Sequence, residues 1–167
     1  MRYDPGARVG RTLSDVRRTK IYLVCSAGGH LAQLVALRDY WVDTERTWVT
    51  FDMPDARSQL AGERIFWAFH PTTRNVFNLA RNFALAVRLL RRDHPEFVIS
   101  DGAGVALPFF IVARILGIKT VYIEVFDRID TTTMTGRLCR PITQLFCVQW
   151  ERQLEQYPGS QVIGPLL

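Results

Sequence analysis

Residues 20–30 read Lys-Ile-Tyr-Leu-Val-Cys-Ser-Ala-Gly-Gly-His, an apolar run that ends in two glycines and a histidine. An apolar run of this length is typical of a β-strand that is covered on both faces. The glycines let backbone N–H groups approach a ligand closely, and the start of a following helix adds positive potential. This strand–glycine–helix unit therefore predicts an α/β fold with a site for a phosphate-bearing ligand.

Strand-like and helix-like segments alternate along the rest of the chain. Strands are expected at residues 20–25, 46–51, 64–69, 96–100, 119–125, 145–150 and 161–163. Helices are expected at residues 30–41, 74–92 and 103–116, and after Thr135. This alternation predicts an α/β, doubly wound, mainly parallel Rossmann-like sheet. Ligands of such sheets bind beyond the carboxyl ends of the strands, so the loops after the strands are the places to search.

The composition is that of one folded domain, with 167 residues of which 48% are hydrophobic and 22% charged. The net charge of +5 is uneven, because residues 1–20 hold six basic and two acidic side chains. We expect residues 1–18 to form a flexible basic arm and residues 19–167 to form the domain. A basic arm indicates an anionic partner surface, and a solubilising leader is the alternative.

Several classes of protein are disfavoured by the sequence. The three cysteines, Cys25, Cys139 and Cys147, have no metal-like spacing and fit reduced thiols of the cytosol. Residues 1–19 contain no apolar signal-peptide core, and no stretch reaches the ~18 apolar residues that span a bilayer. Any membrane association is therefore expected to be peripheral. The patterns of a serine nucleophile elbow, a P-loop and a zinc protease are also missing.

The first candidate site is the loop Ser26-Ala27-Gly28-Gly29-His30. It is not the dinucleotide pattern GxGxxG, although Asp52 at the end of the second expected strand keeps a dinucleotide site possible. His30 is placed at a helix start, where the helix dipole disfavours the charged imidazole. A neutral imidazole there can act as a general base, and a plain helix cap is the alternative.

Two further loops carry candidate site residues. The stretch Ser100-Asp101-Gly102-Ala103-Gly104 repeats the strand–glycine–helix arrangement, so the two glycine loops are expected to flank one crevice. Glu124 ends the fifth expected strand, where a carboxylate can bind sugar hydroxyls or orient a histidine. Arg128 follows it and can pair with a phosphate, or with Glu124 in a structural ion pair.

The segment from Thr73 to Arg92 suggests a membrane contact. Thr73, Arg74 and Asn75 precede an apolar segment that contains arginines and no acidic residue through Arg92. The arginines at 74, 81, 88 and 92 fall near one stripe of the expected helix. A basic amphipathic helix is typical of contact with an anionic membrane surface, and an ordinary solvated basic face is the alternative.

Six segments together resemble one known family: CSAGGHLAQL (25–34), TTRNVFNLARN (72–82), VISDGAGVALPF (98–109), VYIEVFDR (121–128), TMTGRL (133–138) and CVQWE (147–151). They resemble the PssD/CpsF/EpsE-type bacterial exopolysaccharide glycosyltransferase subunits. That family is similar to the eukaryotic membrane-anchor subunit of the dolichol-linked UDP-GlcNAc transferase and to the N-terminal half of MurG. The resemblance spans residues 20–167, with departures in the loop 131–136 and in the lack of an N-terminal transmembrane helix.

The resemblance implies half of an enzyme. The fold would equal the N-terminal, acceptor half of a GT-B glycosyltransferase, and a PssE-like subunit would supply the site for the nucleotide-sugar donor. The acceptor would be a sugar linked to undecaprenyl diphosphate, used in exopolysaccharide biosynthesis. The chain would be cytoplasmic and peripheral on the inner face of the cell membrane. No metal, cofactor or nucleic acid is expected.

The resemblance also implies roles for single residues. Gly28 and Gly29, with residues 102–104, would face the acceptor diphosphate, and His30 would be the base or a phosphate contact. Glu124 would line the acceptor site, and the Arg74-Asn75 pair matches a pair in the family. Two other functions stay open: a non-catalytic scaffold that activates a partner transferase, and a nucleotide-binding oxidoreductase module.

Overall fold

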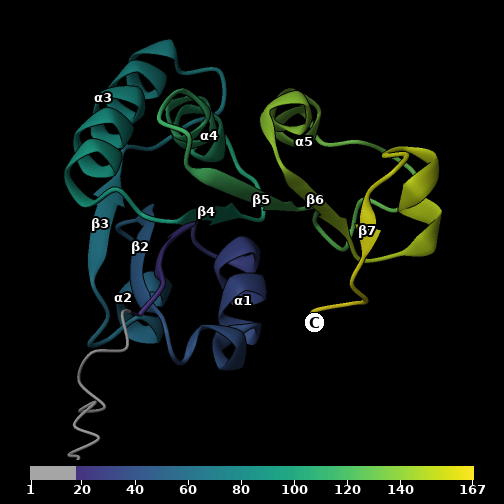
Figure 1. Ribbon diagram of the computed structural model, residues 1–167, viewed down its shortest axis with the longest axis horizontal. Coiled ribbons are helices and arrows are strands. Elements are labelled where there is room, and N and C mark those ends of the chain that lie inside the picture. Colours follow the sequence, from purple (N-terminus) through teal and green to yellow (C-terminus); the bar gives the residue numbers. More distant parts are fainter. Residues whose placement is uncertain (1–17) are drawn as a thin grey trace, which may run out of the picture.

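A seven-stranded sheet forms the centre of the computed structural model, which describes residues 18–167 (Figure 1). The strands are β1 (Lys20–Val24), β2 (Glu45–Phe51), β3 (Ile65–Ala68), β4 (Phe97–Ser100), β5 (Lys119–Ile123), β6 (Leu145–Val148) and β7 (Gln161–Val162). They are all parallel and lie in the order β3-β2-β1-β4-β5-β6-β7. The predicted doubly wound α/β fold is therefore confirmed.

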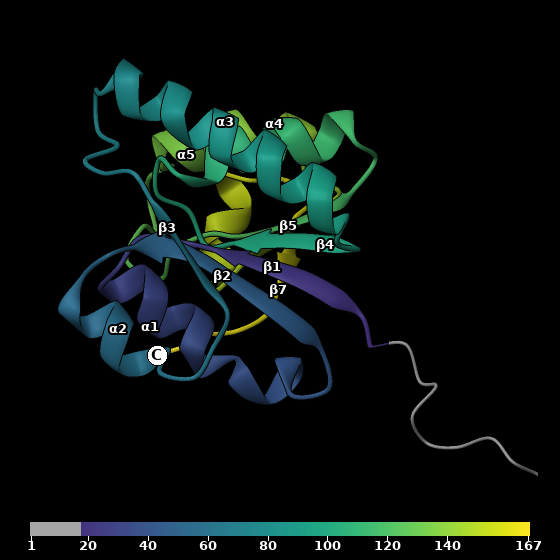
Figure 2. The ribbon, with the colours of Figure 1, turned by 90° about the vertical axis from the view of Figure 1, so that its left-hand side faces the viewer.

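Helices cover both faces of this sheet (Figures 1 and 2). One layer holds α3 (Val76–Asp93), α4 (Ala106–Ile115) and α5 (Met134–Cys139), and the other holds α1 (Gly29–Ala36) and α2 (Pro54–Gln59). Three short 3-10 helices also lie within residues 18–167: η2 (Arg38–Trp41), η3 (Arg140–Ile142) and η4 (Glu151–Glu155).

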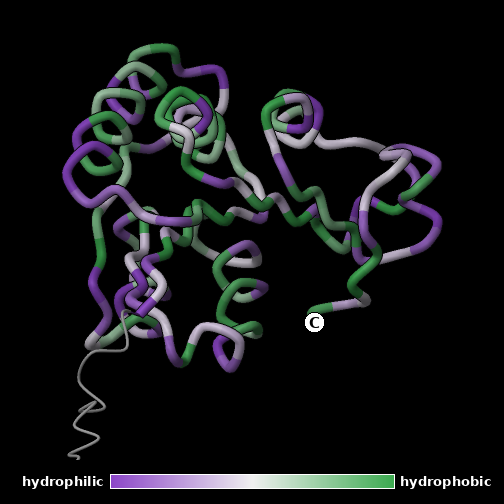
Figure 3. The backbone as a smooth tube through the Cα atoms, viewed as in Figure 1, coloured by the Kyte–Doolittle hydropathy of each residue, from purple (hydrophilic) through white to green (hydrophobic). Residues whose placement is uncertain are grey.

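The core lies on both sides of the sheet, which explains the unbroken apolar run of β1. Tyr22 and Val24 belong to the cluster under α3 and α4, whereas Ile21 and Leu23 belong to the cluster over α1. Successive side chains of a strand point to opposite faces, so both faces must be apolar when both are buried. Figure 3 shows the resulting hydrophobic colour along the central strands.

Three expectations about helices need correction. The helix expected from Arg74 begins at Val76, because Arg74 has a φ of 52° and the Asn75 side chain accepts the N–H of Asn78 as an N-cap. The basic stripe therefore loses Arg74. Residues 30–41 divide into α1 and η2, and the helix expected from residue 103 begins at Ala106. The expected basic arm falls almost wholly on residues 1–17, which lie outside the described part of the chain.

The strand order creates a crevice at the middle of the sheet. β1 pairs with β2 on one side and with β4 on the other, so the chain turns away in opposite directions after β1 and after β4. Loops that diverge at such a switch point leave a ligand site between them. Over residues 18–167, none of the helices has both the length and the apolar character needed to cross a membrane.

Candidate functional site

A cleft of about 540 Å³ opens at the carboxyl ends of the first four strands. Six of the residues singled out in the sequence line it: Ser26, Ala27, His30, Thr73, Ala103 and Gly104. Five lining residues were missed: Phe51, Met53, His70, Pro71 and Thr72. The two glycine loops do contribute to one crevice. Phe51 ends β2 and the other four follow β2 or β3, so the rule that ligands bind beyond strand ends was the signal that could have found them.

The loop after β1 leaves its glycines open. A Cβ atom built on Gly28 or Gly29 would meet no atom within 4 Å. The backbone N–H of Gly28, which has a φ of 76°, donates to Oδ2 of Asp55 in α2 at 2.7 Å. The donor that was predicted to face a diphosphate is thus partnered by a carboxylate, itself an anion.

The loop after β4 is closely packed. Gly102 has a φ of 118°, and a Cβ atom there would lie 2.9 Å from the Tyr122 hydroxyl and 3.2 Å from Cε1 of His30. A Cβ atom on Gly104 would lie 2.9 Å from Cβ of Thr72. These glycines let the loop approach the His30 ring and the wall of the cleft.

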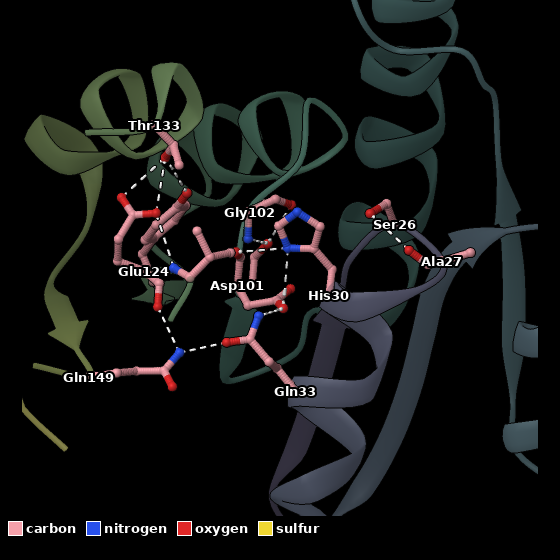
Figure 4. Close-up of polar contacts among 12 residues, drawn as sticks. Ser26, Ala27, His30, Gln33, Asp101, Gly102, Glu124, Thr133 and Gln149 are labelled. Atoms are coloured by element: carbon pink, nitrogen blue, oxygen red, sulfur yellow. Dashed lines mark hydrogen bonds and ion pairs between the residues drawn. The ribbon is translucent and has the colours of Figure 1, made fainter. Parts of the chain in front are cut away.

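His30 is held by Asp101 (Figure 4). Its Nδ1 lies 3.2 Å from Oδ2 of the Asp101 carboxylate and 3.1 Å from the Asp101 carbonyl oxygen. Both partners only accept hydrogen bonds, so Nδ1 carries a proton. In the neutral imidazole, Nε2 is then the nitrogen that can accept a proton. The side chain of His30 is 28% exposed, whereas that of Asp101 is fully buried.

The pKa of His30 is shifted in the direction opposite to the one that a helix dipole alone predicts. Burial lowers the pKa of His30, but the hydrogen bonds and negative charge of Asp101 together raise it by more, so the net shift is upward. Burial raises the pKa of Asp101 to about 6, against the opposing effect of His30. The two groups therefore titrate as a coupled pair.

Glu124 lies deeper in the protein, to the left of His30 in Figure 4. Its carboxylate accepts hydrogen bonds from the Thr133 hydroxyl at 3.1 Å, from the backbone N–H of Val125 at 3.0 Å and from the Tyr157 hydroxyl. Burial raises the pKa of Glu124. Its side chain is fully buried and is not among those that line the cleft, and the residue that contacts His30 is Asp101. A role for Glu124 in a reaction stays a prediction.

The other candidates lie around the cleft. Asn75 caps α3, and Arg74 is exposed outside the cleft lining. Arg128 is exposed, and its carbonyl accepts a hydrogen bond from Gln153. Asp52, the possible ribose ligand of a dinucleotide site, pairs with the neighbouring Arg57 at 2.5 Å. The site role of each stays a prediction.

The sequence of the chain matches the family model described as "Oligosaccharide biosynthesis protein Alg14 like" over residues 68–166, more than half of its length. The chain belongs to the Alg14-like family. It is 31% identical over 98 residues to the "UDP-N-acetylglucosamine transferase subunit ALG14" of Homo sapiens, an alignment that covers 55% of the chain and 45% of the human protein. The chain thus spans about half the length of the human protein. It is 27% identical to the Candida albicans protein of the same name, over 93% of the chain and 68% of that protein.

Solved structures confirm the fold of this Alg14-like chain. MurG from Acinetobacter baumannii superposes with a TM-score of 0.72 at 16% identity, over 87% of the chain and 45% of MurG. The UDP-GlcNAc 2-epimerase from Neisseria meningitidis, bound to UDP-GlcNAc, superposes with a TM-score of 0.66 at 11% identity, over 87% of the chain and 46% of the epimerase. At these identities the likeness shows the fold alone. The chain thus corresponds to under half the length of each of these proteins.

Proposed function

We propose that this Alg14-like chain is the acceptor-binding subunit of a two-chain GT-B glycosyltransferase. In this proposal residues 19–167 hold a sugar linked to undecaprenyl diphosphate, and a PssE-like partner holds the nucleotide sugar. The product serves exopolysaccharide biosynthesis at the inner face of the cell membrane. Membership in the Alg14-like family supports the class of reaction, and the motifs quoted above support the bacterial subtype.

The observation that supports acceptor binding most strongly is the cleft between the two glycine loops, with His30 in its wall. Gly28 and Gly29 leave open space beside the amino end of α1, where backbone donors and helix dipole favour a phosphate group. His30 presents Nε2 as the free acceptor when its imidazole is neutral. One site thus combines features for an anionic group and for proton transfer.

The proposed chemistry is a displacement at the anomeric carbon of the donor sugar. Nε2 of His30 takes the proton of the acceptor hydroxyl while that oxygen bonds to the anomeric carbon. The bond from the anomeric carbon to the diphosphate oxygen breaks, and the nucleoside diphosphate leaves with the electron pair. Holding the acceptor in the cleft against a partner-bound donor supplies proximity.

A surface next to the cleft supports peripheral membrane binding. Thr73 lines the cleft, and α3 begins at Val76 with Val76 and Phe77 largely exposed. Further along α3, Leu79 and Phe83 are partly exposed beside the exposed arginines 81, 88 and 91. Apolar side chains beside arginines suit insertion at an anionic interface. A lipid tail leaving the cleft would pass along this face.

Binding of an isoprenyl diphosphate tests the proposed acceptor site. We expect calorimetric titration with farnesyl diphosphate to show binding to the chain, and His30→Asn to weaken it about tenfold through loss of a phosphate or sugar contact. The matched control is His94→Asn, since His94 is exposed at the end of α3, at a φ of 42° that Asn tolerates. Binding of UDP-GlcNAc without binding of farnesyl diphosphate would contradict the acceptor assignment.

Flotation with vesicles tests the membrane surface. We expect the chain to float with vesicles of phosphatidylglycerol and phosphatidylcholine, and less so as salt is raised. Phe77→Ser should lower the bound fraction several-fold, because a large apolar side chain leaves the bilayer interface. Tyr40→Ser in η2 is the matched control, with a similarly exposed side chain on the other layer. Equal losses in both variants would reject α3 as the contact.

The scaffold and oxidoreductase alternatives predict different results. Full transfer activity of His30→Asn in a mixture with the partner chain would favour a scaffold that only activates the partner. Tight binding of NAD by the isolated chain would favour the oxidoreductase module. The pairing of Asp52 with Arg57 gives NAD a poorer ribose site than the sequence suggested.

A further inference from the structure

A continuous chain of polar contacts lies behind the cleft, and Figure 4 shows the part from Gln149 through Gln33 and Asp101 to His30. Leu166 donates its backbone N–H to Oε1 of Gln149 at 2.9 Å, and Nε2 of Gln149 donates to Oε1 of Gln33 at 2.5 Å. Nε2 of Gln33 then donates to Oδ2 of Asp101 at 3.2 Å. That same oxygen lies 3.2 Å from Nδ1 of His30, which also lies 3.1 Å from the carbonyl oxygen of Asp101 and donates its hydrogen bond there.

The amide orientations in this chain are determined by their partners. Nε2 of Gln149 also donates to the Glu124 carbonyl at 2.9 Å, while its Oε1 accepts the N–H of Leu166. If this amide were turned over, its NH₂ group would face the N–H of Leu166, and its oxygen would face the carbonyl oxygen of Glu124. The amide of Gln33 must then present its NH₂ group to Asp101. Every N–H in the chain thus points toward the Asp101 carboxylate.

Helix α1 supplies two side chains whose nitrogen atoms contact this carboxylate. His30 and Gln33 are three residues apart, so they lie on one face of the helix. Gln33 is 2% exposed and Asp101 is fully buried, and a buried carboxylate is stable only with such donors. Oδ1 of Asp101 has no hydrogen-bond partner within the described residues, so the carboxylate is held through Oδ2.

We propose that Asp101, held by Gln33, is the positioning residue that keeps the proton of neutral His30 on Nδ1 and presents Nε2 to the acceptor hydroxyl. The last step of this proposal rests on the proposed function, whereas the position of the proton does not. Gly102 adds a steric restraint, since its Cα hydrogen faces Cε1 of the ring where any Cβ would be only 3.2 Å away.

Nitrogen NMR of the histidine rings in the full chain tests the proposal without partner, donor or acceptor. Two-bond ¹H–¹⁵N spectra should show neutral His30 with its proton on Nδ1 and a titration midpoint above that of an ordinary histidine. Asp101→Asn should lower this midpoint by about one pH unit or more, because the opposing charge is lost. Gln33→Met, which removes one donor at similar volume, should give a mixture of the two tautomers.

The matched control is Gln153→Met. Gln153 is also fully buried, and its side chain makes four hydrogen bonds. One of them is accepted from the backbone N–H of Gln149, and none of them joins Asp101 or His30. Gln153→Met should lower the stability of the protein and leave the His30 spectrum unchanged. If Gln33 had only a structural role, Gln33→Met would give this same result. A wild-type His30 with its proton on Nε2 overturns the proposal without any variant. The proposal is also overturned if both Asp101→Asn and Gln33→Met leave the titration midpoint and the tautomer of His30 unchanged.

A transfer assay with the partner chain separates this proposal from the proposed function. Asp101→Asn should lower kcat roughly 10–100-fold with little change in KM for the acceptor, as expected when a group acts through another. Altered spectra with unchanged kcat would reject His30 as the base, while the positioning of its proton by Asp101 would stand.

Discussion

The two glycine loops have the same pattern in the sequence, a strand followed by glycines and a helix, but the structure uses them differently. At Gly28 and Gly29 a side-chain atom would meet nothing within 4 Å. At Gly102 and Gly104 it would meet neighbouring side chains at 2.9 Å. The first loop therefore leaves space for a ligand, and the second brings its backbone against the cleft wall and His30. The glycines of the first loop leave room for a ligand, and those of the second allow close packing.

The difference extends to the charged groups of the two loops. The N–H of Gly28 donates to the Asp55 side chain in a hydrogen bond that is exposed at the surface. Asp101 in the second loop is buried and fixed to His30 and Gln33. We therefore expect changes in the second loop to affect folding and protonation, and changes in the first to affect ligand binding.

Gly102→Ala should have the largest effect. Its φ of 118° strains any L side chain, and the new Cβ would press on the Tyr122 hydroxyl at 2.9 Å. Backbone strain and overpacking each cost about 1–3 kcal/mol, so the free energy of unfolding should fall by about 3 kcal/mol in urea denaturation. A loss below about 1 kcal/mol would show that the second loop is not packed as described.

Asp101→Asn should change how stability depends on pH. The folded chain raises the pKa of Asp101 from 3.8 to about 6, so it binds this proton more tightly than the unfolded chain does. Asp101 therefore stabilises the folded chain below pH 4, and this contribution is lost as the pH rises through 6. The pKa of His30 is also raised, so its contribution to stability is likewise lost as the pH rises.

The comparison of wild type and variant isolates this contribution. Between pH 4 and pH 7 the wild type should lose about 2–3 kcal/mol more of its unfolding free energy than Asp101→Asn does. Chemical denaturation at several pH values measures it. Parallel stability curves for the two proteins would contradict the coupled His30–Asp101 pair.

Asp55→Ala should strengthen the binding of a diphosphate at the first loop. The carboxylate partners the Gly28 N–H at 2.7 Å and repels a negative ligand, so its removal should raise affinity for farnesyl diphosphate about fivefold, or ~1 kcal/mol. Calorimetric titration measures this change. Asp39→Ala in η2 is the control for general loss of charge, and an equal gain there would remove the special role of Asp55.

Gly29→Ala should have the smallest effect on folding. Gly29 opens α1 at an ordinary φ with free space around it, so alanine should change the unfolding free energy by less than about 1 kcal/mol, and in the stabilising direction. Urea denaturation beside Gly102→Ala gives the direct comparison of the two loops. A large loss of stability here would mean that the first loop is also packed.

Much of the site was predictable because parallel strands end at one edge. His30, Ala103 and the residues between strand and helix could be placed together from the order of elements alone. The cleft residues Met53 and His70 lie where the same rule applies, but nothing in their local sequence marks them. Asn75 illustrates the limit of periodicity, since one side-chain cap moved the start of α3 away from Arg74.

The contrast between Glu124 and Asp101 shows what local reasoning cannot decide. Both acidic residues lie at or just beyond the end of a central strand, and Glu124 was expected either to bind sugar hydroxyls or to orient a histidine. The side chain of Glu124 instead bonds to Thr133 and Tyr157, and Asp101 holds His30 from 71 positions away in the chain. Which carboxylate faces the histidine depends on how the loops pack.

The sequence by itself determined the alternation of strands and helices, the double-sided burial of the sheet and the edge at which its loops gather. These features follow from the spacing of hydrophobic residues over a few positions, because that spacing decides which side chains share one face of a strand or helix. Only the tertiary structure decided which glycine loop is open and that Asp101 holds His30. It also decided that Gln33 meets Gln149 across 116 positions. Those contacts depend on strand order and on the packing of side chains from distant segments.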